Sequence, residues 1–273
     1  MHEEGQLMDI VIVPTAADVA TYAADVVAGR IAQEPDTVLG VATGSSPVGI
    51  YRELARRRAE GSLDLSHLTC FALDEYVGLP PEHPRSYAAY LDREVVRPFG
   101  LAPEQVRVPD ASRADLGGAA EEYERAIAAA GGIDLQVLGI GTNGHIGFNE
   151  PISSLSSRTR VAALSAQTRA DNARFFDRPD DVPTHCLTQG LGTILEARQV
   201  LLVAQGERKA AAVAAAVEGP VAARCPASVL QFHPRTTLVL DEAAASGLTL
   251  GDGHSPVPDQ GDGRGSDGSA PAS

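Results

Sequence analysis

The sequence predicts an α/β fold built on a mainly parallel sheet with helices on both faces. Short β-rich runs alternate with longer alanine-rich amphipathic segments, and the runs are apolar and bounded by turn residues. Parallel strands joined by helices are buried on both faces, which accounts for the continuous apolar runs. The predicted strands are, in order, MDIVIV, TVLGVAT, LTCFALD, LQVLGIG, QVLLVAQ and TTLVLD. The predicted helices span residues 16–31, 47–58, 118–130 and 207–217.

These elements follow one another mostly as strand and then helix. MDIVIV precedes the first helical segment, and TVLGVAT precedes the second, which opens with Pro47 where the first helical turn favours proline. LQVLGIG is different, because the residues after it have no helical period. Functional sites in such sheets lie at the carboxyl ends of the strands, so the residues just after each strand are the candidates for catalysis and ligand binding.

Length and composition favour a single α/β domain over residues 1–250. A chain of 273 residues, 44% of them hydrophobic, can bury a sizeable core. Residues 152–181 are rich in Ser, Arg and Asp and separate two α/β stretches, like an insertion able to cover a site. Residues 251–273 have almost no large apolar side chain, so we expect a disordered tail.

The formal net charge of -14 argues against binding to nucleic acid or to an anionic membrane, since both attract basic surfaces. Any anionic substrate must therefore meet a locally basic pocket. No apolar segment reaches the length of a membrane span, and no basic region precedes an apolar run near the N-terminus, so we expect a cytoplasmic protein. The three cysteines are scattered, which indicates neither a disulfide framework nor a zinc site.

The stretch VATGSSPVGIYREL places a Thr-Gly-Ser-Ser turn between a strand and a helix. Free backbone N–H groups, hydroxyls and the positive end of a helix dipole meet at such a junction, so Thr43, Gly44, Ser45 and Ser46 are candidates for binding phosphate. Alternatively, a serine there only caps the helix. The stretch is not a Walker loop, because the lysine of that motif is absent.

In TCFALDEYVGLPPEHPRSY, Asp74 and Glu75 directly end a strand. Neighbouring strand residues point to opposite faces, so we do not expect both carboxylates in one pocket. A partly desolvated carboxylate at this edge could act as a base in proton transfer. A solvated acidic loop is the alternative.

The stretch GIGTNGHIGFNEP begins with G-x-G-x-x-G but continues with Gly147, Asn149 and Pro151, which do not form a helix. A dinucleotide-binding site needs a helix there, so we reject that interpretation. The glycines instead predict a tight loop carrying Asn143, His145 and Glu150. His and Glu can form a general-base pair; a metal site lacks a third ligand, and a purely structural loop remains an alternative.

Basic side chains gather in the insertion and after the strand QVLLVAQ. In an acidic chain they are candidates for an anion clamp, because arginine matches phosphate oxygens, although a solvated surface run is the alternative. They are Arg158, Arg160, Arg169, Arg174, Arg178 and Lys209.

These motifs together resemble the glucosamine-6-phosphate deaminase family. The resemblance runs from about residue 8 to 242, through ATGSSP, FALDEYVGLPPEHPRSY, GIGTNGHIGFNEP, SSRTR, TRADNARFF, VEGP and LQFHP. It implies a modified Rossmann-like fold, no cofactor and no metal, and conversion of glucosamine 6-phosphate and water into fructose 6-phosphate and ammonia. It also implies that residues 152–181 form a mobile lid.

The resemblance also implies roles for individual residues. His145, with Glu150 and Asn143, opens the sugar ring, and Asp74 then moves a proton from C2 towards C1. The phosphate is held by Thr43, Gly44, Ser45, Ser46, Arg174 and Lys209.

The chain departs from allosteric members of the family, which carry Asp at the position of Asn143. Their effector site uses an Arg matched by Arg160, a Lys replaced here by Ala162, and a C-terminal Tyr, whereas Tyr123 is the last tyrosine of this chain. We therefore expect N-acetylglucosamine 6-phosphate to activate weakly or not at all. A severalfold shift of the substrate saturation curve would contradict this expectation.

Three alternatives share parts of the pattern. A 6-phosphogluconolactonase has a similar fold and also binds a sugar phosphate, but DEYVGL and GHIGFNEP favour the deaminase. A galactosamine-6-phosphate deaminase would differ in only a few contacts. A sugar-phosphate sensor of a transcription regulator would carry a helix-turn-helix, for which we expect no room before the first strand. The sequence does not decide whether the protein is a homo-oligomer.

Overall fold

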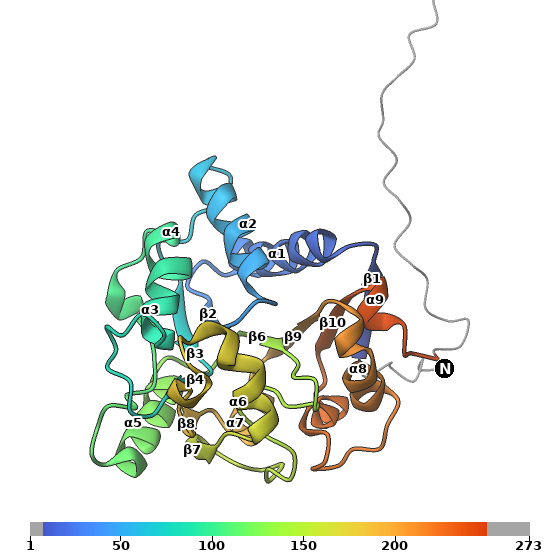
Figure 1. Ribbon diagram of the computed structural model, residues 1–273. Helices are drawn as coiled ribbons and strands as arrows, with labels where there is room; N and C mark the ends of the chain where they lie inside the picture. Colours follow the sequence, from blue (N-terminus) through green and yellow to red (C-terminus); the bar gives the residue numbers. More distant parts are fainter. Residues whose placement is uncertain (1–7, 250–273) are drawn as a thin grey trace, which may run out of the picture.

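A seven-stranded parallel sheet forms the centre of the molecule (Figure 1), in the computed structural model that describes residues 8–249. Its strands lie in the order β1-β10-β9-β6-β2-β3-β5. All six predicted strands belong to it, and a short edge strand, β5, is the seventh. The bounds are β1 Met8–Val13, β2 Val38–Val41, β3 Thr69–Ala72, β5 Val106–Arg107, β6 Leu135–Gly139, β9 Gln199–Ala204 and β10 Thr236–Asp241.

Helices cover both faces of this sheet, and the four predicted helical segments are found close to their expected bounds. The α-helices are α1 Ala16–Gln33, α2 Val48–Ala59, α3 Tyr87–Leu91, α4 Arg97–Phe99, α5 Leu116–Ala129, α6 Ala166–Asn172, α7 Leu191–Leu195, α8 Ala210–Val217 and α9 Glu242–Ala245. A π-helical turn, η1 Asp92–Val96, joins α3 to α4. Short 3₁₀ turns are η2 Pro103–Gln105, η3 Ala173–Phe175, η4 Pro179–Asp181, η5 Glu207–Lys209 and η6 Pro226–Phe232.

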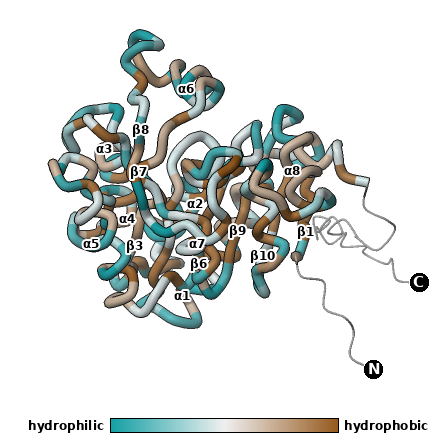
Figure 2. The backbone as a smooth tube through the Cα atoms, turned by 90° about the horizontal axis from the view of Figure 1, so that it is seen from below, coloured by the Kyte–Doolittle hydropathy of each residue, from teal (hydrophilic) through white to brown (hydrophobic). Residues whose placement is uncertain are grey.

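The strands separate two hydrophobic cores, and the alternation of side chains along β6 shows why. Leu135 and Val137 point to the core that contains α1 and α2, whereas Leu138 points to the core that contains α5, α7 and α8. Figure 2 accordingly shows apolar strands in the interior and polar segments at the outer turns. The expected α/β architecture with helices on both faces is confirmed.

A second, smaller sheet was not predicted. It is antiparallel, with the order β4-β8-β7, and consists of β4 Asp74–Tyr76, β8 His185–Thr188 and β7 Arg160–Ala163. Strand β7 lies inside the predicted insertion 152–181. This part of the insertion is therefore hydrogen-bonded to β8 and is not free to cover the site. Four residues with half-buried and exposed side chains give too weak a period to be recognised, and their pairing depends on β8, which is distant in sequence.

The topology places the site. β2 and β6 are neighbours in the sheet, but the chain continues from β2 to β3 on one side and reaches β9 on the other side of β6. The carboxyl ends of two such strands open a crevice where ligands bind. The turn after β2 and the loop after β6 therefore face each other across this crevice.

Two further expectations from the sequence concern the C-terminal tail and membrane-spanning helices. The tail 251–273 lies outside the described residues, so its expected disorder stays a prediction. Among residues 8–249, no helix combines the length and the apolar character that a bilayer span demands.

Candidate active site

The turn after β2 presents backbone and hydroxyl groups to the crevice. Gly44 has a positive φ of 99°, a conformation that glycine adopts without strain. Helix α2 begins behind the turn with Pro47 as N-cap, and no side chain caps it, so neither Ser45 nor Ser46 serves as a cap. The capping alternative is therefore wrong, and the first N–H groups of α2 and the serine hydroxyls remain available to an anion.

A cavity of about 740 Å³ lies in this crevice. Eight of the ten candidate site residues line it, from the turn after β2, the start of β4, the loop after β6, the segment after α6 and the turn before α8. They are Thr43, Gly44, Ser45, Ser46, Asp74, His145, Arg174 and Lys209. Asn143 and Glu150 do not line the cavity but lie behind His145.

A chain of hydrogen bonds fixes the imidazole of His145. Its Nδ1 lies 2.7 Å from Oδ1 of Asn143, and Nδ2 of Asn143 donates to Oε2 of Glu150 at 2.8 Å. A carboxylate only accepts, so the amide of Asn143 must turn its oxygen to the ring, and Nδ1 then carries the proton. Nε2 is left with a lone pair. Burial lowers the pKa of His145, while the charge of Glu150 opposes this effect, so the ring is neutral near pH 7.

The ring of His145 packs directly on the backbone at Gly141. A Cβ at Gly141 would lie 2.3 Å from Cε1 and 2.4 Å from Nδ1 of that ring. We therefore expect Gly141→Ala to displace the imidazole. Because His145 is the predicted base of ring opening, turnover should fall by up to about 10²-fold, as small misplacements of such a group have effects of that size.

Steady-state kinetics with thermal unfolding tests this prediction. Gly29→Ala is a matched control, since Gly29 lies in helix α1 with nothing within 4 Å of an added Cβ. Alanine should raise helix stability there by about 0.5–1 kcal/mol and leave turnover unchanged. Wild-type turnover in Gly141→Ala would contradict the role of this close contact.

Asp74 is a buried carboxylic acid that lines the cavity, with 4% of its surface exposed. Burial raises the pKa of Asp74 to about 8, the carboxylate of Glu75 adds to the rise, and the amide of Phe148 opposes it. Glu75 points away and does not line the cavity. The prediction that these neighbours would not enter one pocket is confirmed.

Both predicted phosphate-binding cations line the cavity, and four further arginines that were not predicted also line it, namely Arg52, Arg85, Arg93 and Arg208. Nζ of Lys209 donates to the carbonyl of Ile140 at 2.6 Å, and burial lowers the pKa of this amine. Arg174 stacks on the ring of Phe175 at 4.7 Å and is otherwise exposed. Arg174 and Lys209 line the same cavity as the turn after β2, so both can contact a dianionic group bound at that turn.

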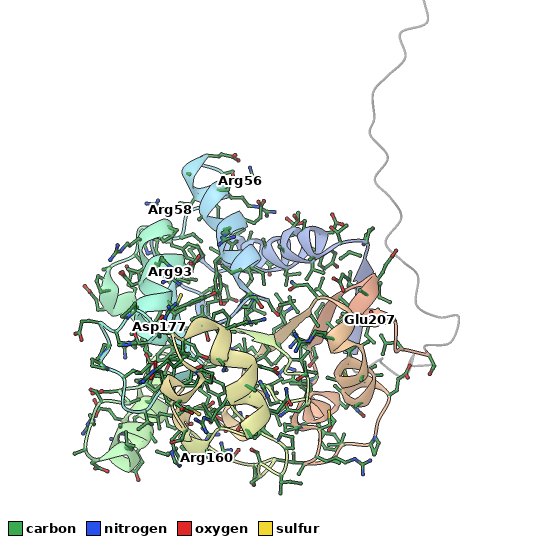
Figure 3. The ribbon with its side chains drawn as sticks, viewed as in Figure 1. Arg56, Arg58, Arg93, Arg160, Asp177 and Glu207 are labelled. Carbon is green, nitrogen blue, oxygen red and sulfur yellow. The ribbon has the colours of Figure 1, made fainter. Side chains whose placement is uncertain are left out.

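The expected cluster of five arginines does not form, because Arg174 is the only one of these five that lines the cavity. Arg158 pairs with Glu124 and Glu196, and Arg178 pairs with Asp181. Arg160 donates to Asn149 and Ser153, and Figure 3 shows it near the bottom of the view, away from Glu207, which begins the turn that contains Lys209. Acidic and polar side chains therefore hold Arg158, Arg160 and Arg178 away from the cavity, whereas Nε of Arg169 is buried without a hydrogen-bond partner.

Aromatic side chains that were not predicted from the sequence form one wall of the cavity. Tyr76 and Tyr87 lie with ring centroids 4.7 Å apart, and Tyr87 stacks on Phe148 at 5.9 Å. Nδ2 of Asn172 donates to the hydroxyl of Tyr76 at 3.1 Å. These residues come from four separate segments, so no local pattern predicts that they meet.

A protein-family model, described as glucosamine-6-phosphate isomerases/6-phosphogluconolactonase, matches residues 14–239. The chain belongs to this family. A member from Arthrobacter sp. strain FB24, named glucosamine-6-phosphate deaminase, is 57% identical over 245 residues, which are 90% of this chain and 94% of that protein.

Solved structures of the same family agree. A monomeric glucosamine-6-phosphate deaminase matches with a TM-score of 0.86 and 39% identity, over 88% of this chain and all of that one. A 6-phosphogluconolactonase from Trypanosoma cruzi matches with a TM-score of 0.73 and 18% identity, over 91% of this chain and 100% of that one. The second likeness concerns the fold alone.

Proposed function

We propose that this protein is a glucosamine-6-phosphate deaminase, which converts glucosamine 6-phosphate and water into fructose 6-phosphate and ammonia. The observation that carries the proposal is one cavity in which Asp74 and His145, from different strand ends, face a phosphate-binding turn. The reaction needs two separate proton-transfer groups and a tether at the far end of the sugar. Identity of 57% to a relative of that name supports the assignment.

Ring opening is the task of His145. Its Nε2 accepts the proton of the anomeric hydroxyl and returns a proton to the ring oxygen, which yields the open-chain aldehyde. Glu150, through Asn143, favours the imidazolium that forms between these steps, although Asn143 itself cannot take up the proton.

Isomerisation is the task of Asp74. Its carboxylate removes the proton at C2 while the aldehyde oxygen takes up the proton that the C2 ammonium group gives up, which produces an enolamine. The protonated Asp74 then delivers its proton to C1, which converts the enolamine into an iminium at C2. Water then adds at C2 and ammonia leaves, so the product is the ketose. Burial raises the pKa of Asp74 to about 8, so the acid is mainly protonated at pH 7 in the free protein, and an ammonium group on the bound sugar favours its ionised form.

The phosphate is held at the opposite end of the cavity. The turn Thr43 to Ser46 offers N–H and hydroxyl donors, and Arg174 and Lys209 supply positive charge. Anchoring the phosphate orients C1 and C2 at the two proton-transfer groups. No resident cofactor or metal has a step in this scheme.

We place the mobile lid in the second half of the insertion, residues 164–181. Helix α6 and the turn after it line one wall of the cavity, and polar contacts hold them to it. Oγ1 of Thr142 donates to Asp171 at 3.2 Å, and Asn172 donates to Tyr76. Residues 152–163 are excluded because residues 160–163 form β7, which is hydrogen-bonded to β8, and because backbone hydrogen bonds tie Ile152 to Ala223 and Ser157 to Gly192.

A 6-phosphogluconolactonase is the less favoured candidate. Hydrolysis of a lactone needs one base for water and leaves the buried Asp74 without a role. Galactosamine 6-phosphate stays a candidate substrate, because one inverted hydroxyl changes few contacts. We further propose that the protein acts in the cytoplasm, in the degradation of N-acetylglucosamine. A homo-oligomer is compatible with this proposal.

Ammonia release by the purified protein tests the proposal. Glucosamine 6-phosphate should give stoichiometric ammonia and fructose 6-phosphate, with galactosamine 6-phosphate assayed alongside and 6-phosphogluconolactone as the hydrolase control. Ammonia from neither amino sugar would refute the deaminase. Faster turnover of the galacto epimer would change the substrate and keep the reaction.

A further inference from the structure

Glu75 is buried next to Asp74, with 4% of its surface exposed, and its carboxylate meets three backbone amides. Oε1 accepts from the amides of Tyr76 at 2.7 Å and Tyr87 at 2.9 Å, and Oε2 accepts from the amide of Ala88 at 2.8 Å. Two of these amides belong to the start of α3, so the side chain ties β4 to that helix.

The hydrogen bonds indicate that Glu75 is ionised. Burial raises the pKa of Glu75, and all three amides oppose that rise. Oε1 accepts two N–H donors and Oε2 accepts one, and hydrogen bonds from N–H donors favour the carboxylate form. A fixed negative charge therefore lies beside Asp74.

The helix that Glu75 holds is a wall of the cavity and contacts two other parts of the site. The ring of Tyr87 stacks on Phe148, which belongs to the loop of His145, with an angle of 16° between the rings. The hydroxyl of Tyr90 donates to the carbonyl of Gly44 at 2.8 Å, in the phosphate-binding turn. Helix α3 thus connects three parts of the site, and Glu75 anchors it to the strand of the base.

We propose that Glu75 is a positioning residue of the reaction, whose carboxylate fixes α3 against β4 and places a negative charge beside the base Asp74. The inference rests on the deaminase function proposed above. It separates two roles of one side chain, hydrogen bonding to the wall and charge beside the base.

The surroundings of Asp74 leave the electrostatic role to Glu75. Besides Glu75, the titratable groups that interact with Asp74 from β4, α3, α5 and β8 are Tyr76, Tyr87, Tyr123 and Cys186. Burial raises the pKa of each of these four, so all of them are neutral below pH 9 and none supplies a cation. The charge of Glu75 acts together with burial to keep Asp74 protonated.

Two substitutions separate the roles. Glu75→Gln removes the charge and turns an amide donor towards Ala88, so the acidic limb of the kcat/KM profile should move down by about one pH unit, and KM should rise severalfold. Glu75→Asp keeps the charge but is one methylene too short for the amides of α3. The acidic limb of the kcat/KM profile of Glu75→Asp should stay near the wild-type position while KM rises.

Glu104→Gln is the matched control, because it removes the same charge from an exposed turn and should change neither quantity. A folded Glu75→Gln with a wild-type limb would overturn the inference, as would a Glu75→Asp whose limb moves equally far. Unchanged KM in both variants would also overturn it. Absence of ammonia from the wild-type protein would instead refute the proposed function.

Hydrogen exchange on the unmodified chain is a second test, because it depends neither on the folding of a variant nor on enzyme turnover. The amides of Tyr87 and Ala88 should exchange at least about 100-fold more slowly than amides of exposed loops, because the carboxylate of Glu75 holds them. Exchange at the rate of an exposed loop would show that Glu75 does not anchor α3.

Discussion

Replacement of Asp74 by asparagine should remove nearly all turnover and leave the fold intact. The amide has the shape of the carboxylate but cannot take up the proton at C2, and a general base contributes about 10²- to 10⁴-fold. KM should change little, because the phosphate-binding turn is untouched. Ammonia release under saturating glucosamine 6-phosphate measures the effect. A variant with more than a tenth of wild-type turnover would contradict the role of Asp74; a sugar-phosphate sensor would tolerate this change.

The same substitution should stabilise the protein at alkaline pH. The pKa of Asp74 is about 8 in the folded state and about 3.9 in an unfolded chain, so the folded state holds an extra proton between these values. Stability contributed by Asp74 is therefore full below about pH 4 and is lost as pH rises towards 8. Thermal unfolding of Asp74→Asn should match wild type near pH 4 and exceed it near pH 8. A lower Tm at pH 8 would contradict the raised pKa.

Replacement of His145 by glutamine should have the second-largest effect. The variant lacks the lone pair of Nε2, which accepts the anomeric proton, and we expect turnover to fall about 10²- to 10⁴-fold with little change in KM. His67→Gln is a suitable control, because His67 is exposed and does not line the cavity. Turnover within tenfold of wild type in His145→Gln would show that ring opening does not depend on this imidazole.

Local sequence patterns predicted much of the fold and part of the site. Six strands were recognisable because each is apolar over four to six residues and bounded by turn residues. Asn143, His145 and Glu150 are close in sequence on a tight loop, so their contact needs no long-range information. The alternation along a strand was enough to separate Asp74 from Glu75.

Other features depend on segments that are distant in sequence. The antiparallel sheet pairs β4 with β8 and β8 with β7, and no strand of it has a strong period. The partners of Arg158 lie on α5 and next to α7, which is why a cluster of arginines in sequence did not become an anion clamp. Tyr87 meets Phe148 only because α3 is held against β4.

The sequence by itself determined the parallel α/β architecture, the family and the chemical groups available for the reaction, because periodicity and short motifs are local properties of the chain. The tertiary structure alone decided which groups share a cavity and how they titrate. A carboxylic acid at the end of a strand is an ordinary acid until burial and the neighbouring charge of Glu75 act on it, and burial depends on the packing of the whole domain.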